Sequence, residues 1–377
     1  MIGTWAERCD AAGLPPAITA AWDMLAIRAA TPNIFYERWM VAPSAALAAT
    51  GPPDLLLVWH GPVGDRTRLI GLLPLQPGRM AGRYSPALLQ NWEQPVRALG
   101  DPLVLAGHER DFWIAALAHL DRHGSGAYLR LSTLAADGSV TAALLALLAE
   151  RRRPWAVTRR TVRAILRHGP TSAAYRAAHI RKKVLKEQRR LLNRLGEHGE
   201  LSVDRLADDA DPARWIDALF ALELGGWKGR DGVAAAADPV RERSFRQILT
   251  TAHALGRLDF RRLALDGAPL AMLATIETPQ GHAFQLKIAY DENYAAFSPG
   301  VLLEMACLDV MLDEGRLDLV DSCARAGHPM IDRIWVERRD IISLTLPFDR
   351  PLSRLLHAGR ALAVRAAARR RAIRTER

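Results

Sequence analysis

Apolar residues in the first third of the chain form short runs that alternate with clusters of turn-forming residues. The runs 55–59 and 69–75 are rich in Leu, Val and Ile and flank a connector, 60–65, that contains two glycines and a proline. They therefore predict the two strands of an antiparallel hairpin. Segments 18–30, 111–123 and 140–152 have the length and apolar spacing of helices. This pattern predicts a mixed α/β unit with a core of its own.

The second half of the chain repeats this alternation. A long amphipathic helix is predicted over 172–195, with a lysine- and arginine-rich face that is either solvated or turned toward an anion. Three strands follow in series, and Asp266-Gly267 marks a tight turn between the first two. A loop then leads into a helix over 300–314 and a strand over 317–321. The three predicted strands are 257–265, 268–277 and 281–289.

These patterns predict an α+β (layered α/β) fold in which a mainly antiparallel mixed sheet flanked by helices occurs twice. We expect an N-terminal module over 1–165, a C-terminal module over 166–350 and a basic amphipathic tail over 351–377. The modules should meet near 155–175.

Charge is unevenly distributed along the chain. The formal net charge is +10, but 151–194 holds 15 Lys and Arg against the single acid Glu187, and 350–377 holds nine Arg against Glu376. Two basic segments therefore sit on an acidic body, and such segments attract nucleic acid, acidic lipid or a phosphorylated ligand. For the tail, an anionic membrane surface, nucleic acid and a plainly solvated helix all remain open.

Several kinds of site are not indicated by any motif. The three cysteines form no CxxC, and HExxH, GxSxG and GxxxxGK[ST] do not occur, so we expect no metal site, no α/β-hydrolase and no P-loop. The longest apolar stretch, 140–149, is about half of what a membrane span requires. No apolar leader is seen at the N-terminus. The expected location is therefore the cytoplasm, with peripheral contact to the inner membrane surface as a possibility for the tail.

The segment Ser298-Pro299-Gly300-Val301-Leu302 is the most informative spot for chemistry. It lies between a predicted strand and a predicted helix, where the first turn of the helix offers unpaired N–H groups and the positive end of the dipole. Proline lacks an N–H and glycine lets a ligand approach the backbone. These features suit a phosphate or pyrophosphate. An ordinary helix N-terminus is the alternative.

The run 286–303, LKIAYDENYAAFSPGVLL, resembles the GNAT acetyltransferases of the CelD-like (cellulose-biosynthesis CelD-type) branch. Members of that group show a strand, a YD..Y....SPG..L loop and a helix. The likeness extends to the hairpin 266–271, to the end of the basic helix at 190–195, to 315–321, and in the first third to 35–39 and 70–75. It implies two GNAT-like modules in tandem, as in FemABX-type peptidyltransferases.

The resemblance implies that acetyl-CoA or another acyl-CoA lies in a V-shaped gap between two strands, with its pyrophosphate held at the stretch 293–300. We therefore assign cofactor binding to Ser298, Gly300, Val301 and Leu302. The backbone N–H groups of the last three are expected to point into a gap beside strand 282–289. No metal is implied.

Acyl transfer to an amine needs a base, donors for the oxyanion and an acid for the leaving thiolate. For these roles we name Asp321, at a strand end, with Tyr290 and Lys287. Each has a structural alternative; Lys287, for instance, could be a plain surface residue of its strand. A second group could line the acceptor channel or simply end a helix, and it comprises Glu223, Trp227 and Lys228.

The resulting hypothesis is a GNAT-type acyltransferase that moves an acyl group from acyl-CoA to an amine or hydroxyl of a sugar, lipid or polysaccharide precursor. Two alternatives remain. One is a FemABX-like transferase that uses aminoacyl-tRNA, in which the basic helix would follow the phosphates. The other is a non-catalytic GNAT-fold accessory protein of envelope or exopolysaccharide assembly.

Overall fold

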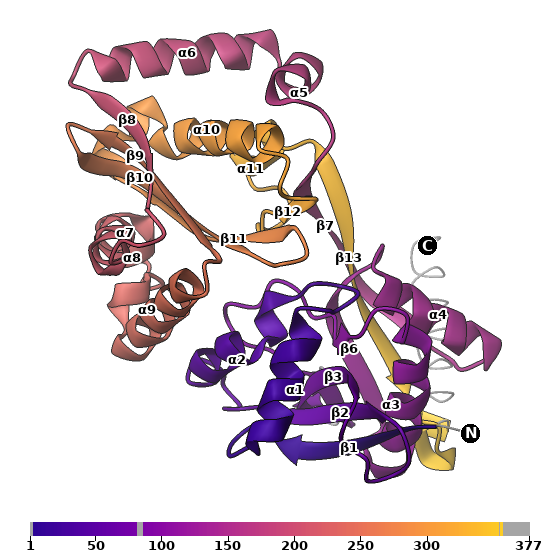
Figure 1. Ribbon diagram of the computed structural model, residues 1–377. Coiled ribbons are helices and arrows are strands. Elements are labelled where there is room, and N and C mark those ends of the chain that lie inside the picture. The colour runs from indigo at the N-terminus through magenta and orange to yellow at the C-terminus, as the bar shows by residue number, and fades with distance from the viewer. Residues whose placement is uncertain (1–2, 81–85, 354, 357–377) are drawn as a thin grey trace, which may run out of the picture.

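A mixed sheet of thirteen strands runs through the whole of this computed structural model (Figure 1). The structure describes residues 3–80, 86–353 and 355–356. The strand order is β1-β2-β3-β4-β6-β13-β7-β12-β11-β10-β9-β8, and β5 pairs with β3 at the side of this path. The protein therefore has the mixed α/β fold that the sequence predicts, with helices flanking a largely antiparallel sheet.

The first half of the chain supplies one end of the sheet. Its elements are β1 (Thr4–Asp10), α1 (Pro16–Ala26), η1 (Ile34–Tyr36), α2 (Arg38–Ala45), β2 (Asp54–His60), β3 (Leu69–Arg79), β4 (Ala87–Asn91), β5 (Leu103–Val104), α3 (Glu109–His123), β6 (Tyr128–Ala135), α4 (Ser139–Glu150) and β7 (Ala156–Arg167).

The second half supplies the other end. Its elements are α5 (Ser172–His179), α6 (Lys182–Gly196), β8 (Leu201–Arg205), α7 (Ala213–Gly225), α8 (Trp227–Arg230), η2 (Ala235–Ala237), α9 (Pro239–Ala254), β9 (Leu258–Leu265), β10 (Ala268–Glu277), β11 (His282–Tyr290), η3 (Glu292–Phe297), α10 (Pro299–Asp313), β12 (Leu319–Asp321), α11 (Ile331–Ile334) and β13 (Glu337–Pro347).

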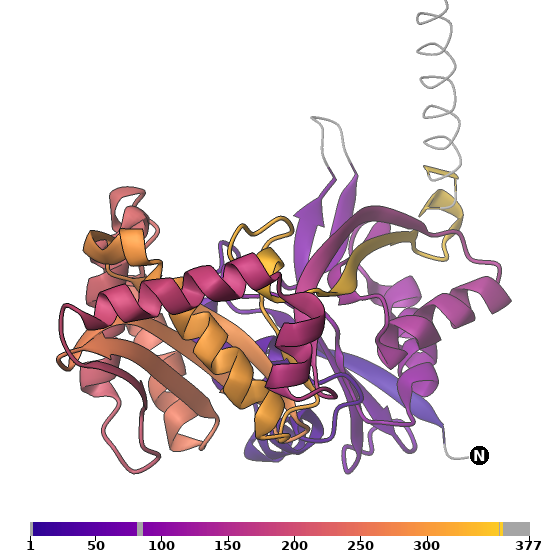
Figure 2. The same cartoon turned by 90° about the horizontal axis from the view of Figure 1, so that it is seen from above.

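The two halves share one plan, and we call them the first repeat (β1 to β7) and the second repeat (β8 to β13). In each, four main strands pair antiparallel in sequence order, and the fourth then pairs in parallel with the strand that follows the next long helix: β4 with β6, and β11 with β12. Helices α5, α6 and α10 cover one face of the second repeat, and α7 to α9 the other (Figure 1). Seen from above, α6 lies across α10 (Figure 2).

The last strand of each repeat pairs with the other repeat. Strand β7 pairs with β12, β13 pairs with β6, and β7 and β13 pair with each other. The predicted boundary at 165 therefore falls inside a strand that contacts both repeats, and the division at 165 and 350 stays a prediction. Residues 357–377, most of the predicted tail, lie outside the described residues.

Two details differ from the sequence-based prediction. The helix predicted over 172–195 is broken into α5 and α6, because Ile180 adopts an extended conformation that buries its side chain. Five strands were not predicted: β1, β4, β5, β7 and β13. Strand β7 is mostly exposed and rich in arginine, so it lacks the apolar signal of a central strand.

The core is continuous across the repeats. Apolar residues of β13, including Leu344, pack into the core of the first repeat, whereas Phe35 of the first repeat stacks edge-on against Phe284 of the second. Helix α2 lies beside α9, and Glu37 at the start of α2 forms a buried ion pair with Arg257 at 2.5 Å. Neither repeat therefore buries its apolar surface alone.

We expect Leu344→Ala to lower the free energy of unfolding by about 2–5 kcal/mol, because the side chain is fully buried between the strands of both repeats. Urea unfolding followed by circular dichroism measures this. The matched control is Leu355→Ala, whose side chain is 70% exposed. A transition in which only residues after β7 lose structure would contradict the joint core.

Candidate active site

Strands β11 and β12 part after a short parallel ladder. They pair only at His282 with Leu319, Ala283 with Val320 and Phe284 with Asp321. Beyond this point β11 continues to Tyr290, whereas the chain after β12 turns away. The register between β10 and β11 shifts next to Leu286, which marks a bulge that bends β11. One edge of β11 is thus left without a partner strand.

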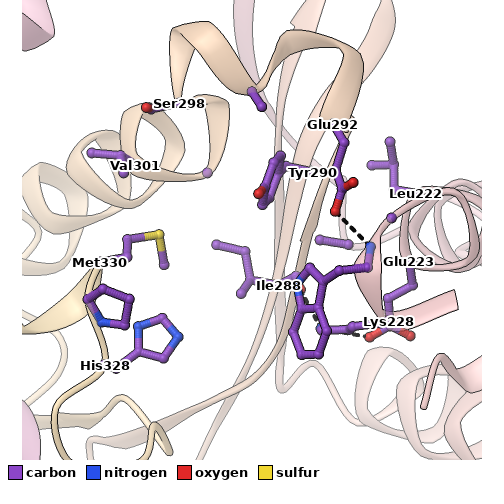
Figure 3. Close-up of a pocket in the computed structure, with 16 residues that line it drawn as sticks. Leu222, Glu223, Lys228, Ile288, Tyr290, Glu292, Ser298, Val301, His328 and Met330 are labelled. Atoms are coloured by element: carbon purple, nitrogen blue, oxygen red, sulfur yellow. Dashed lines mark hydrogen bonds and ion pairs between the residues drawn. The ribbon is translucent and has the colours of Figure 1, made fainter. Parts of the chain in front are cut away.

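A cavity of about 560 Å³ lies beside the open end of β11 and the start of α10, and we call it the helix-end cavity (Figure 3). Its walls come from α7, α8, β11, α10 and the loop before α11. His328 and Met330, which were not assigned a role, also line it. The cavity brings together seven of the predicted site residues, namely Glu223, Trp227, Lys228, Tyr290, Ser298, Gly300 and Val301.

The start of α10 differs from the predicted anion site. The N–H groups of Val301 and Leu302 donate to the carbonyl oxygen of Ser298 at 2.9 and 3.1 Å, so they do not point into the gap, and this prediction was wrong. Ser298 itself has φ +53°, a left-handed conformation that closes the turn around its own carbonyl. Gly300 is open toward the cavity, since a Cβ there would meet Tyr290 and Met330 at ordinary contact distances.

Glu223 is held in a buried charge cluster. Its Oε1 accepts from Lys228 at 2.8 Å and from Lys287 at 2.6 Å, and its Oε2 accepts from the backbone N–H of Ala235 at 2.9 Å. Lys228 also donates to the carbonyl oxygen of Ile288 at 2.8 Å, on strand β11. The cluster therefore anchors α7 and α8 to β11.

The cluster carries one net positive charge beside the cavity. Burial raises the pKa of Glu223, but the two ammonium groups outweigh this and hold it below its ordinary value. Burial lowers the pKa of Lys287, opposed by Glu223 and reinforced by the repulsion of Lys228. Because Glu223 is saturated by its partners, Lys228 and Lys287 are the members that can attract an anion.

Trp227 lies at the mouth of the helix-end cavity. Its side chain is 45% exposed, and its backbone N–H donates to Oε1 of Glu292 at 2.7 Å. Glu292 in turn pairs with Arg230 at 2.7 Å. An exposed indole over an apolar cavity is a surface on which a flat ligand can stack.

Asp321 lies apart from these residues. Its side chain is fully buried, pairs with Arg163 at 3.2 Å and accepts the N–H of Cys323 at 2.7 Å. The geometry thus gives this carboxylate a structural partner on β7 and no lining position in the helix-end cavity. Leu302 also lies outside that cavity, in a groove between α6 and α10.

A second cavity, of about 280 Å³, fills the gap between the parting strands, and we call it the splay cavity. At its wall stands Glu304 of α10, a residue that the sequence analysis did not single out. Its side chain is completely buried, Oε1 accepts from Gln285 at 2.8 Å, and the indole of Trp335 is a second neutral neighbour that stabilises the carboxylate. Burial raises the pKa of Glu304 to about 7.

One signal in the sequence points to Glu304. It stands alone among apolar residues in the first half of α10, where neighbours on every side are buried. A single carboxylate inside such a run is costly unless it is paired or neutral, so it is a marker of function or of a buried network. The site predicted from the sequence was placed at the start of this helix instead.

Residues 182–326 match the family model described as acetyltransferase (GNAT) domain. The matched stretch runs from α6 to just beyond β12 and includes the parting strands and most of the residues that line the two cavities, whereas the lining residues within 328–331 lie beyond it. This part of the chain is therefore similar to GNAT acetyltransferase domains. Among curated proteins, none matches the sequence. The CelD-like branch stays a prediction.

Solved structures resemble the chain over nearly its whole length. FemX shares 10% identity with a TM-score of 0.56, covering 93% of this chain and 99% of FemX. A conserved protein of unknown function from Bacteroides thetaiotaomicron VPI-5482 shares 13% identity with a TM-score of 0.51, covering 92% and 100%. A tandem GNAT protein from the clavulanic acid pathway shares 16%, with a TM-score of 0.44 and coverage of 92% and 99%. The first two likenesses show that this chain shares its overall fold with those proteins.

Two further observations concern the described residues. They contain no group of three or more His, Cys, Asp or Glu side chains placed to hold a metal ion. No helix among them has the length and apolar character needed to cross a membrane.

We expect the free energy of unfolding of Glu304→Gln, relative to that of the wild type, to increase as pH rises from 5 to 8. A buried carboxyl with a pKa of about 7 keeps a proton that the unfolded chain releases near 4.5, so wild-type stability falls across this window. The fall is on the order of 3 kcal/mol, and glutamine does not titrate. Urea unfolding at both pH values measures the difference.

The control for this experiment is Glu187→Gln, which replaces an exposed carboxylate whose pKa is lowered by Arg190. The free energy of unfolding of this variant should differ from that of the wild type by the same amount at both pH values. A constant difference for Glu304→Gln would mean that Glu304 does not titrate in this range.

Proposed function

We propose that the protein is an acyltransferase that takes an acyl group from acyl-CoA and transfers it to an amine or hydroxyl of a sugar, lipid or polysaccharide precursor. The observation that carries this is the parting of β11 from β12 in the domain that matches the GNAT model. It leaves an unpaired strand edge between two connected cavities, and an extended amide-containing chain can add to such an edge by backbone hydrogen bonding.

The residues present fit such a donor. The pantetheine arm, which carries two amides, would lie along β11, and Trp227 offers a stacking surface at the cavity mouth. Lys228 and the exposed residues Lys183 of α6 and Arg230 of α8 supply positive charge around the openings for the phosphates. Backbone N–H groups at α10 contribute less than the sequence predicted, because two of them are already bonded.

Glu304 is the proton acceptor that we propose for the reaction. The acceptor nitrogen or oxygen attacks the thioester carbonyl carbon, its proton passes to the Glu304 carboxylate, and the carbon–sulfur bond breaks to release the CoA thiolate, which takes up a proton. A carboxyl with a pKa of about 7 is suited to this exchange near neutral pH. Tyr290, whose ring lines the helix-end cavity, remains a candidate acid for the thiolate.

Gly300→Val is expected to weaken acetyl-CoA binding at least about tenfold, because the two added methyl groups project toward Tyr290 and Met330 and narrow the helix-end cavity. Isothermal titration of both proteins with acetyl-CoA measures this. The control is Gly169→Val, where an added Cβ meets nothing within 4 Å. Equal affinities for Gly300→Val and the wild type would place the donor elsewhere.

A kinetic experiment tests the role of Glu304. Wild-type hydrolysis of acetyl-CoA by water, the smallest acceptor, is expected to rise with pH and level off above about 7, as the carboxylate forms. Glu304→Gln should lose about 100-fold or more in rate while binding acetyl-CoA normally, because general base catalysis contributes that much. An unchanged rate and pH profile in the variant would exclude this role.

A second function is favoured by α6. Its outer face carries Lys182, Lys183, Lys186 and Arg189, all exposed and without an ion-pair partner among the described residues. A transferase that uses aminoacyl-tRNA could follow the phosphates along this face. Failure to bind acetyl-CoA, together with tRNA binding that weakens steeply with added salt, would favour this reading over the first.

A further inference from the structure

A third cavity, of about 600 Å³, lies between the two repeats, and we call it the seam cleft. Its walls come from both repeats: the loop after β4 and strand β6 from one side, α9 and the segment after β12 from the other, with the exchanged strands β7 and β13 between them.

The seam cleft is positively charged. Four arginines and one acid line it, namely Arg97, Arg159, Arg163, Arg325 and Glu93. Two of the arginines are engaged within the protein: Arg163 pairs with Asp321 at 3.2 Å, and Arg97 donates to the hydroxyl of Tyr36 at 2.7 Å. Arg159 and Arg325 are exposed and have no ion-pair partner among the described residues.

The backbone around this cleft is locally strained. Thr133 has φ +56° and Cys323 has φ +52°, conformations that are costly for residues with a Cβ and especially for a β-branched one. Next to Ser343, which also lines the cleft, the register of β13 shifts against both β6 and β7. Bulges and left-handed residues therefore occur on several sides of this one cleft.

The splay cavity borders both the seam cleft and the helix-end cavity. The seam cleft shares Leu286, Cys323, Ala324 and Arg325 with the splay cavity, which in turn shares Lys228, Ile288, His328 and Met330 with the helix-end cavity. The seam cleft and the helix-end cavity share no residue. Glu304 therefore lines a cavity that borders two others, and those two have no lining residue in common.

We propose that the seam cleft binds the acyl acceptor through an anionic group, a phosphate or a carboxylate, held by Arg159 and Arg325. This inference rests on the proposed function and names the class of its acceptor. Guanidinium groups match the oxygen spacing of both anions and bind them in a fork. An acceptor held there reaches its amine or hydroxyl into the splay cavity, where the acyl group arrives from the other side.

The experiment uses inorganic pyrophosphate and succinate as probes of the two anion chemistries, titrated calorimetrically into the full-length protein at low salt. Each titration is run with and without saturating acetyl-CoA, which fills the donor's phosphate sites. We expect one probe to bind in both conditions, and its identity tells phosphate from carboxylate. The double variant Arg159→Gln, Arg325→Gln should bind it at least tenfold more weakly.

The control removes two positive charges elsewhere, with Arg160→Gln on β7 and Arg190→Gln on α6, both at exposed positions. It should bind the probe like the wild type. Retained acetyl-CoA binding by the Arg159, Arg325 variant shows that it is folded and that the proposed function stands. Binding of neither probe, displacement of the probe by acetyl-CoA, or equal loss in the control variant would overturn the inference.

Discussion

The pairing of β7 with β13 is the constraint on which the rest of the structure depends. Each of these strands ends its own repeat and continues the sheet of the other, so the repeats cannot separate without breaking ladders on both sides. The buried pair of Glu37 and Arg257 adds a second tie. The splay cavity and the seam cleft are bounded by strands that meet at this junction. Their relative placement is thus fixed before any ligand binds, which lowers the entropic cost of bringing two reactants together.

The two repeats share a topology but differ at the point where their parallel strands part. In the first repeat, β4 and β6 also pair over only three residues. There, however, the buried side chain of Asn91 bridges the parting strands: its Nδ2 donates to the carbonyl oxygens of Gly100 and Ser132, and its Oδ1 accepts the N–H of Ser132. This amide closes the gap that β11 and β12 leave open. The gap between the parting strands is therefore closed in the first repeat and open in the second, where the splay cavity lies.

The sequence allowed the hairpins and α10 to be predicted because their signals are local: turn residues, apolar alternation and a Ser-Pro-Gly helix start. Most of the site residues predicted from the sequence also line the helix-end cavity. It did not predict β7 and β13, since their pairing depends on contacts far apart in the chain. The predicted direction of the Val301 and Leu302 N–H groups was wrong for a related reason. The left-handed conformation of Ser298, which turns its carbonyl toward Val301 and Leu302, follows from tertiary packing and has no sequence signal of its own.

Three buried carboxylates surround the open gap, and their partners give each a different character. Glu223 has two ammonium groups and a backbone amide, and Asp321 has a guanidinium and a backbone amide. Glu304 has only neutral neighbours, the amide of Gln285 and the indole of Trp335. In an interior of low dielectric constant, the first two are stabilised as anions and serve as fixed structural charges. Glu304 alone lacks a compensating cation, so its two protonation states are close in free energy. That balance separates the residue able to move a proton from its structural neighbours.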